Sequence, residues 1–162
     1  NGKKKEIIQI GAIKVNENFK IEKELNIYVK PVFNPVLSKY IQDLTGLKQS
    51  LIDKKGIEFE TAFKMFLDFT DNNLIISNGD DGKVLYLNLK YHNIKKKYPN
   101  ILNVKNIFRD RYMIPRNMLH STVIHSYFGY KLSIKKFHNP IEDCKNILKV
   151  IKKINFNFNY VV

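Results

Sequence analysis

The chain has 162 residues, 44% of them hydrophobic, which suffices for one α/β domain with its own core and is too little for two. It holds no run of eighteen apolar residues, and no apolar stretch of the signal-peptide type follows its first residues. These features argue against a membrane protein and predict a soluble one. The single cysteine, Cys144, cannot form an internal disulfide, which favours the cytoplasm.

Positive charge dominates the composition, since 28 Lys and Arg residues oppose 15 Asp and Glu, for a formal net charge of +13. Such a balance is typical of surfaces that bind polyanions, because lysines that neutralise phosphates supply most non-specific affinity for nucleic acids. The joint abundance of Lys, Asn and Ile is equally expected of an AT-rich genome, so both explanations stay open. The chain does not begin with Met, and its polar start leads into a strand, so we expect a fragment.

The first predicted element is a β-hairpin. Residues 6–15 (EIIQIGAIKV) form a dense apolar, β-branched run without helical spacing, and residues 20–29 alternate between apolar and polar side chains. The polar residues 16–18 between them form the turn. A short helical segment follows, with Ser38 as its N-cap and Gly46 after its last residue.

The middle of the chain alternates between helical and strand patterns. In chain order these predict an amphipathic helix over 60–70, a short buried strand over 74–76, a loop over 77–82, a helix over 84–92, a strand over 101–108, and a helix from Arg116 or Asn117 up to Gly129. Alternating strands and helices are typical of an α/β domain.

The last predicted helix has the clearest start. Asn139 suits the N-cap, Pro140 the first helical position, and Glu142 the third position of a capping box. An apolar stripe follows at helical spacing, formed by Ile141, Cys144, Ile147, Leu148 and Ile151. Beyond residue 154, strict alternation over 155–160 predicts an edge strand or a segment that docks on another molecule.

Two acidic sites stand where open α/β sheets bind their ligands, at strand ends and helix starts. Asp80 and Asp81 directly follow the strand over 74–76, and Asp143 lies one turn into the last helix, just after His138. Carboxylates gathered at such a point need a divalent cation to neutralise them, and a nearby histidine can take a proton from water near neutral pH. As alternatives, Asp80 and Asp81 are ordinary turn residues, and His138 is a surface residue before a cap.

Five segments, in this order and spacing, resemble the DEDDh (DnaQ-like) family of 3′→5′ exonucleases: 6–15, Tyr28–Pro31, Leu44–Leu47, Ser77–Asp81 and His138–Asp143. The most specific of them is a histidine followed five positions later by an aspartate at a helix start. The resemblance implies a ribonuclease H-like α/β fold, with a mixed β-sheet flanked by helices. It also implies hydrolysis of single-stranded DNA or RNA from the 3′ end with two Mg²⁺ or Mn²⁺ ions.

The resemblance further implies roles for individual residues. Asp143 and Asp81 would be metal ligands, with Asp80 as the alternative to Asp81, and His138 would be the general base. Contacts to nucleic acid would come from four residues: Thr45, Gly46 and Leu47, against the 3′-terminal nucleotide, and Asn78.

The first motif of the family, an Asp-x-Glu on the first strand, has no counterpart in the chain, although in the family those two carboxylates hold both metal ions. We therefore expect residues 1–154 to form an exonuclease-like domain without its first strand, and residues 155–162 to form a strand-like tail that can contact a protein partner. A strand and loop of roughly a dozen residues would precede Asn1. The alternative is a catalytically inactive module that binds nucleic acid or a partner protein.

Overall fold

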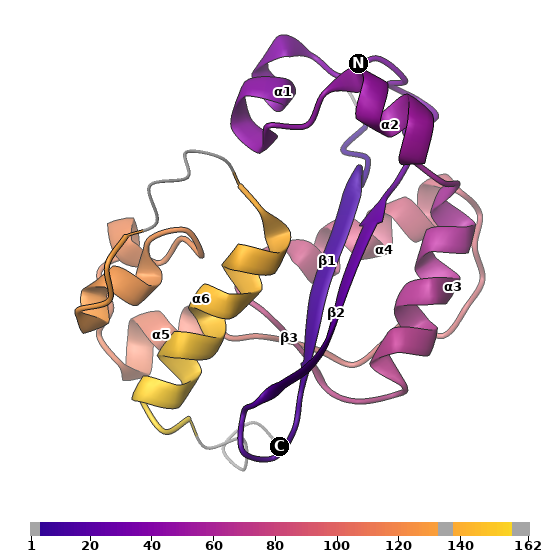
Figure 1. Ribbon diagram of the computed structural model, residues 1–162. Helices are drawn as coiled ribbons and strands as arrows, with labels where there is room; N and C mark the ends of the chain where they lie inside the picture. The colour runs from indigo at the N-terminus through magenta and orange to yellow at the C-terminus, as the bar shows by residue number, and fades with distance from the viewer. Residues whose placement is uncertain (1–3, 133–137, 157–162) are drawn as a thin grey trace.

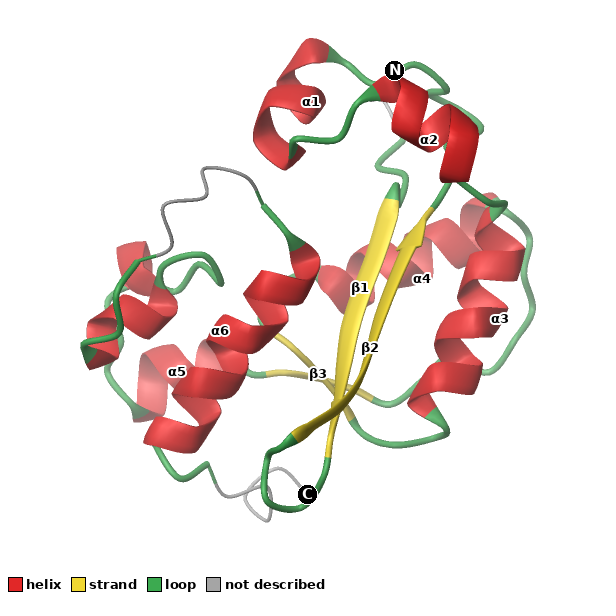
Figure 2. Ribbon diagram, viewed as in Figure 1, coloured by secondary structure: helices red, strands yellow, loops and turns green. Residues whose placement is uncertain are grey.

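A long antiparallel hairpin of β1 (Gln9–Val15) and β2 (Ile21–Tyr28) crosses the centre of the fold, with helices on both sides (Figure 1). The computed structural model describes residues 4–132 and 138–156. Figure 2 shows the helices and strands of this part of the chain, which after the hairpin are α1 (Lys39–Thr45), α2 (Gln49–Lys55), α3 (Phe59–Thr70), β3 (Ile75–Ser77), α4 (Asp81–Tyr91), β4 (Ile101–Asn103), α5 (Lys105–Arg111), the 3₁₀ helices η1 (Arg116–Met118) and η2 (Ile124–Phe128), and α6 (Pro140–Lys153).

The two faces of the hairpin meet different helices, because successive residues of a strand point to opposite faces. Ile10 and Ile27, which pair across the hairpin, are buried against α3 and α4. Gly11 faces the other way and lies directly against Pro140 of α6. The predicted hairpin is therefore confirmed, and it stands between two groups of helices.

The first core lies between the hairpin, α3 and α4. The predicted amphipathic helix over 60–70 is confirmed as α3, whose apolar face buries Phe59, Ala62, Phe63 and Phe66. From α4, Leu85 and Leu89 join this core. The α4 helix begins at Asp81, one turn before the predicted residue 84.

The second core lies between α5, the 3₁₀ helices and α6. Ile147, Val150 and Ile151 of α6 pack there with Phe108 of α5 and Ile124 of η2. Phe156, just after α6, also belongs to this core, whereas residues 157–162 of the predicted tail lie outside the described residues. In the ranges 4–132 and 138–156, no helix is both long and apolar enough to cross a membrane.

A second sheet consists of β3 and β4, which run parallel with Ile75 opposite Ile101. Within the described ranges the strands thus form two two-stranded sheets, one antiparallel and one parallel. Both kinds of pairing are expected of a mixed sheet. The predicted strand over 74–76 forms one residue later, and Leu74 is 43% exposed rather than buried.

Two predictions for residues 101–129 are wrong in part. The strand predicted over 101–108 ends at Asn103, and Val104 and Phe108 are instead buried together at helical spacing around the start of α5. The helix predicted up to Gly129 is divided into η1 and η2, although Gly129 does end η2 with a left-handed φ of 83°.

Glu6 fastens the loop between β2 and α1 to the chain just before β1. Its carboxylate accepts hydrogen bonds from the backbone N–H groups of Val32, Phe33 and Asn34, at 2.6, 3.0 and 2.7 Å. Burial opposes ionisation of Glu6, but these hydrogen bonds outweigh it and hold its pKa below the usual value. The charged form of Glu6 therefore stabilises the folded chain.

Replacing Glu6 with Gln is expected to lower the free energy of unfolding by roughly 1–2 kcal/mol at pH 7, since a charged acceptor becomes a neutral one. Because the folded-state pKa is lowered, this contribution is present above pH 4.5 and disappears as the pH falls through the folded-state pKa. Urea unfolding at pH 7 and pH 3 checks this, with the exposed Glu17→Gln as control. Equal losses at both pH values would contradict it.

Candidate active site

The N-terminus of α6 places Asp143 beside His138. The Asn139 side chain accepts hydrogen bonds from the backbone N–H groups of Ile141 and Glu142, so the predicted cap is confirmed and fixes the first turn. One oxygen of the Asp143 carboxylate lies 3.5 Å from Nδ1 of His138. The His138 side chain is 41% exposed, so the imidazole can reach solvent or a ligand. The Glu142 carboxylate, predicted to complete a capping box, instead contacts Lys145 at 3.6 Å.

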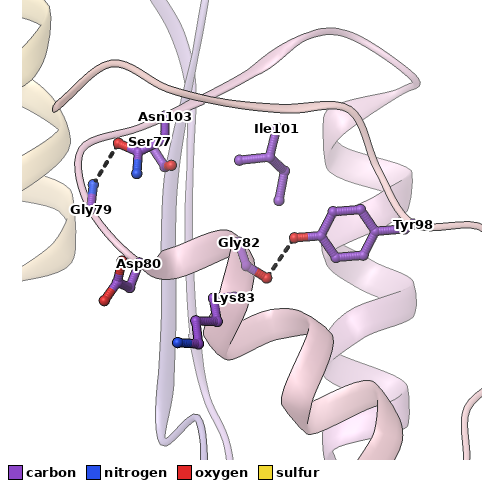
Figure 3. Close-up of a pocket in the computed structure, with 8 residues that line it drawn as sticks. All are labelled: Ser77, Gly79, Asp80, Gly82, Lys83, Tyr98, Ile101 and Asn103. Carbon is purple, nitrogen blue, oxygen red and sulfur yellow. Dashed lines mark hydrogen bonds between the residues drawn. The ribbon is translucent and has the colours of Figure 1, made fainter. Parts of the chain in front are cut away.

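The N-terminus of α4 carries the other predicted carboxylates. The chain turns at Gly79 with φ of 152°, and Asp80 and Asp81 follow as the N-cap and first residue of α4. Asn103, at the end of β4, holds this turn in place, because its side-chain oxygen accepts a hydrogen bond of 3.2 Å from the Gly79 backbone N–H (Figure 3). The same oxygen accepts a hydrogen bond of 3.0 Å from the backbone N–H of Lys105.

Asp143 and Asp81 are both partly removed from water. Burial raises the pKa of Asp143, and the charge of Asp81 adds to the rise, while His138 and a hydrogen bond from Ser121 partly offset it. Asp81 keeps much of its surface exposed, yet the protein atoms around it displace enough water to raise its pKa as well. Asp80 adds to this rise and Lys105 partly offsets it. The N-termini of α4 and α6 thus lie close enough for the charge of Asp81 to act on Asp143.

Close contact between α6 and β1 holds Asp143 in this position. A Cβ atom on Gly11 would lie 2.5 Å from Cβ of Pro140, so the helix can approach the strand this closely only because residue 11 is glycine. One turn later, the Cys144 thiol donates to the Gly11 carbonyl at 3.7 Å. Burial, together with the charges of Asp143 and Asp81, raises the pKa of Cys144 to about 11, so the thiol stays protonated near neutral pH.

The predicted nucleotide-binding turn lies at the end of α1. As predicted, Ser38 caps this helix and Gly46 ends it with a left-handed φ of 70°. The Thr45 hydroxyl accepts a hydrogen bond of 3.2 Å from the Leu47 backbone N–H, which shapes the turn, and Leu47 itself is only 6% exposed. The carbonyl of Leu44 accepts a hydrogen bond of 3.1 Å from the backbone N–H of His138, so this turn is joined to the Asp143 site.

Asn78, also predicted to contact nucleic acid, makes an intramolecular contact. Its side-chain amide donates a 2.8 Å hydrogen bond to the carbonyl of Leu119, two residues before Ser121. This bond links the end of β3 to the loop that reaches Asp143, and we interpret Asn78 as a residue that positions this loop.

Asn103, Lys105 and Ser121 contribute to the site without having been predicted. Asn103 was recoverable in principle, because polar residues at the carboxyl ends of parallel strands gather at one sheet edge, but the predicted strand ran through it. Lys105 and Ser121 reach the carboxylates only through the tertiary fold.

The carboxylates of Asp81 and Asp143 are chemically suitable ligands for a divalent cation, but they are few in number. Asp81 and Asp143 are partly desolvated, and the charge of Asp81 raises the cost of ionising Asp143. Both offer the oxygen ligands that Mg²⁺ and Mn²⁺ prefer. Within residues 4–132 and 138–156, however, no group of three or more His, Cys, Asp or Glu side chains is arranged to hold a metal ion. Among the described residues, Asp81 and Asp143 are therefore two candidate ligands rather than a complete metal site.

Comparison with known proteins gives the family. The RNase T exonuclease family model matches residues 1–151. The chain therefore belongs to this exonuclease family, and its resemblance to DEDDh exonucleases is confirmed.

Relatives of known activity are 3′-5′ exonucleases. The chain is 21% identical over 163 residues to the 3′-5′ exonuclease eri1 of Schizosaccharomyces pombe, covering 81% of this chain and 54% of the relative. It is 26% identical over 168 residues to human ERI1 exoribonuclease 3, covering 93% of this chain and 48% of the relative. The chain thus spans about half the length of these relatives.

Solved structures share the fold. The nuclease domain of 3′hExo, a DEDDh family member bound to rAMP, superposes with a TM-score of 0.78 at 22% identity, over 93% of this chain and 81% of that one. The cell-death related nuclease 4 superposes with a TM-score of 0.74 at 23% identity, over 93% and 57%. The ribonuclease H-like fold predicted from the sequence is therefore confirmed.

Proposed function

We propose that the protein is a metal-dependent exonuclease that removes nucleotides from the 3′ ends of single-stranded nucleic acid. The observation that carries this proposal is that Asp81 and Asp143, from two separate helix N-termini, interact electrostatically, with His138 3.5 Å from Asp143. Family membership supports it. The charge of +13 suits a polyanionic substrate.

In this proposal, Asp81 and Asp143 would hold Mg²⁺ or Mn²⁺. The bound cations would stabilise the charge that develops on the phosphate and lower the pKa of the attacking water. His138, 3.5 Å from Asp143 and open to solvent, would accept the proton of that water. Asp143 would orient the imidazole and stabilise its protonated form. The turn at Thr45 and Gly46 would hold the 3′-terminal nucleotide near His138, to which it is joined by the Leu44 carbonyl.

Two carboxylates are fewer than two metal ions need, so we propose that further oxygen ligands come from outside the described residues. The division of the strands into two two-stranded sheets supports this, because a mixed sheet that lacks one strand between its halves would divide in this way. A strand carrying an Asp-x-Glu motif at that place would supply both missing carboxylates. We also propose that residues 1–154 form the exonuclease-like domain to which this strand would be added.

A second candidate function is a binding module without catalysis. It is favoured by the absence of a three-ligand metal cluster from the part of the chain that the structure describes. Such a module would grip nucleic acid or a protein partner, the latter through the tail over 155–162. Both candidates are compatible with a cytoplasmic location, which the single Cys144 favours.

A 5′-labelled oligonucleotide separates the two candidates. With Mn²⁺, the full-length protein is expected to shorten it one nucleotide at a time from the 3′ end, and His138→Ala is expected to slow this about 10²–10⁴-fold, the usual contribution of a general base. A gel time course with RNA and with DNA measures both effects and the substrate preference. Binding without any shortening, in Mg²⁺ or Mn²⁺, would favour the binding module.

A further inference from the structure

One face of α4 combines positive charge with exposed aromatic rings. Lys83, Tyr86 and Lys90 follow each other at i, i+3 and i+7, which places them along one side of a helix. Tyr98, from the loop before β4, lies next to Tyr86 with 6.3 Å between ring centroids. We call these four residues the α4 platform.

The rings of the α4 platform are exposed but held in place. Tyr86 is 48% exposed and Tyr98 39%. The Lys90 ammonium lies 4.7 Å from the Tyr86 ring centre, the two tyrosine rings meet edge to face, and the Tyr98 hydroxyl donates to the carbonyl of Gly82. A ring that is ordered before a ligand arrives loses little conformational freedom on binding.

The α4 platform begins beside the turn that leads into the candidate active site. Lys83 and Tyr98 line a pocket of about 190 Å³ together with Asp80 and Gly79, the residues just before Asp81. Figure 3 shows the Tyr98 ring reaching toward the first turn of α4, where Lys83 stands. From Lys83 to Lys90 the platform extends about 10 Å along the helix, away from the catalytic carboxylates.

We propose that the α4 platform binds the part of a single-stranded nucleic acid that lies on the 5′ side of the terminal nucleotide in the active site. This rests on the proposed function and adds the path of the substrate strand. Lysines neutralise its phosphates, and the tyrosines stack with its bases, a combination that grips single strands regardless of sequence. A protein partner fits less well, because the exposed cations of the platform would need acidic side chains, whereas a single strand supplies both charge and flat apolar faces.

The test measures binding separately from cutting. In the full-length Asp143→Asn protein, affinity for a 5′-labelled oligouridylate and oligothymidylate of about a dozen nucleotides is followed by fluorescence anisotropy across salt concentrations. The double variant Lys83→Gln/Lys90→Gln is expected to reduce the slope of log K against log salt by about 1.4, since each phosphate contact to a single strand contributes about 0.7. Tyr86→Ala is expected to weaken binding about tenfold, with little change in slope.

The matched control is Lys152→Gln/Lys153→Gln, which removes the same charge from the exposed end of α6. An unchanged slope in the α4 variant, or an equal change in the control, would overturn the proposal. In protein with an intact Asp143, the α4 variant is expected to raise the KM for long strands more than the KM for a dinucleotide. If the normal protein cuts nothing, the proposed function fails, while the binding measurements still decide the role of the α4 platform.

Discussion

Asp143→Asn is expected to reduce exonuclease activity at least about a thousandfold, because several kcal/mol of transition-state stabilisation depend on the bound metal ions. The same change is expected to raise the melting temperature of the metal-free protein by a few degrees. Burial raises the pKa of Asp143, so its charged form destabilises the folded chain above that pKa, and a neutral amide removes the cost.

Measurements of the melting temperature as a function of metal concentration and pH test whether Asp143 lowers stability while it binds metal. In the normal protein, adding Mn²⁺ is expected to raise the melting temperature, and lowering the pH through the raised pKa of Asp143 is expected to stabilise the metal-free form. Both responses should be smaller in Asp143→Asn. Asp68→Asn, an exposed change on α3, serves as control. Undiminished activity of Asp143→Asn would show that Asp143 is not a catalytic residue.

Gly11→Val is expected to impair both stability and catalysis. The added side chain would occupy the space of Pro140, whose Cβ lies 2.5 Å from the position of a Cβ on residue 11, and α6 must move away from β1. Overpacking of this kind costs about 1–3 kcal/mol of stability. A shift of about 1 Å in Asp143 and His138 is expected to lower the activity of the folded protein about a hundredfold.

A comparison variant separates these two effects. Leu67→Ala on α3 reduces packing in the first core, away from α6, and is expected to lower stability with little change in activity per folded molecule. Activity is compared at a temperature where circular dichroism shows both variants to be folded. Equal activities would show that Gly11 matters for stability alone.

Elements with strong local signals were predictable from the sequence. The hairpin follows from an apolar, β-branched run and an alternating run, α1 from Ser38 and Gly46, and α6 from the cap at Asn139, because these signals act within a few residues. The strand predicted over 101–108 failed because its apolar residues satisfy two periodicities, and the hydrogen bonds of Asn103, which end β4, connect to the distant Gly79.

The acidic residues of the candidate site were predictable from the sequence. The residues that surround and position them were less so. Asp81, Asp143 and His138 stand at element starts that the sequence marks. The environment that raises both aspartate pKa values arises from burial and from Ser121 and Lys105, which no local pattern connects to them. Asn78 illustrates the same limit, since its partner, the Leu119 carbonyl, lies 41 residues away in sequence.

If the proposed function holds, the hydrogen bond from the His138 backbone N–H to the Leu44 carbonyl would let the protein sense its substrate. A nucleotide seated against the turn after α1 would press on the segment to which the backbone of His138 is hydrogen-bonded. Correct seating of the strand end and alignment of the base then become a single event. An ill-fitting end would leave the base misaligned, so discrimination would appear in the rate of cleavage rather than in affinity.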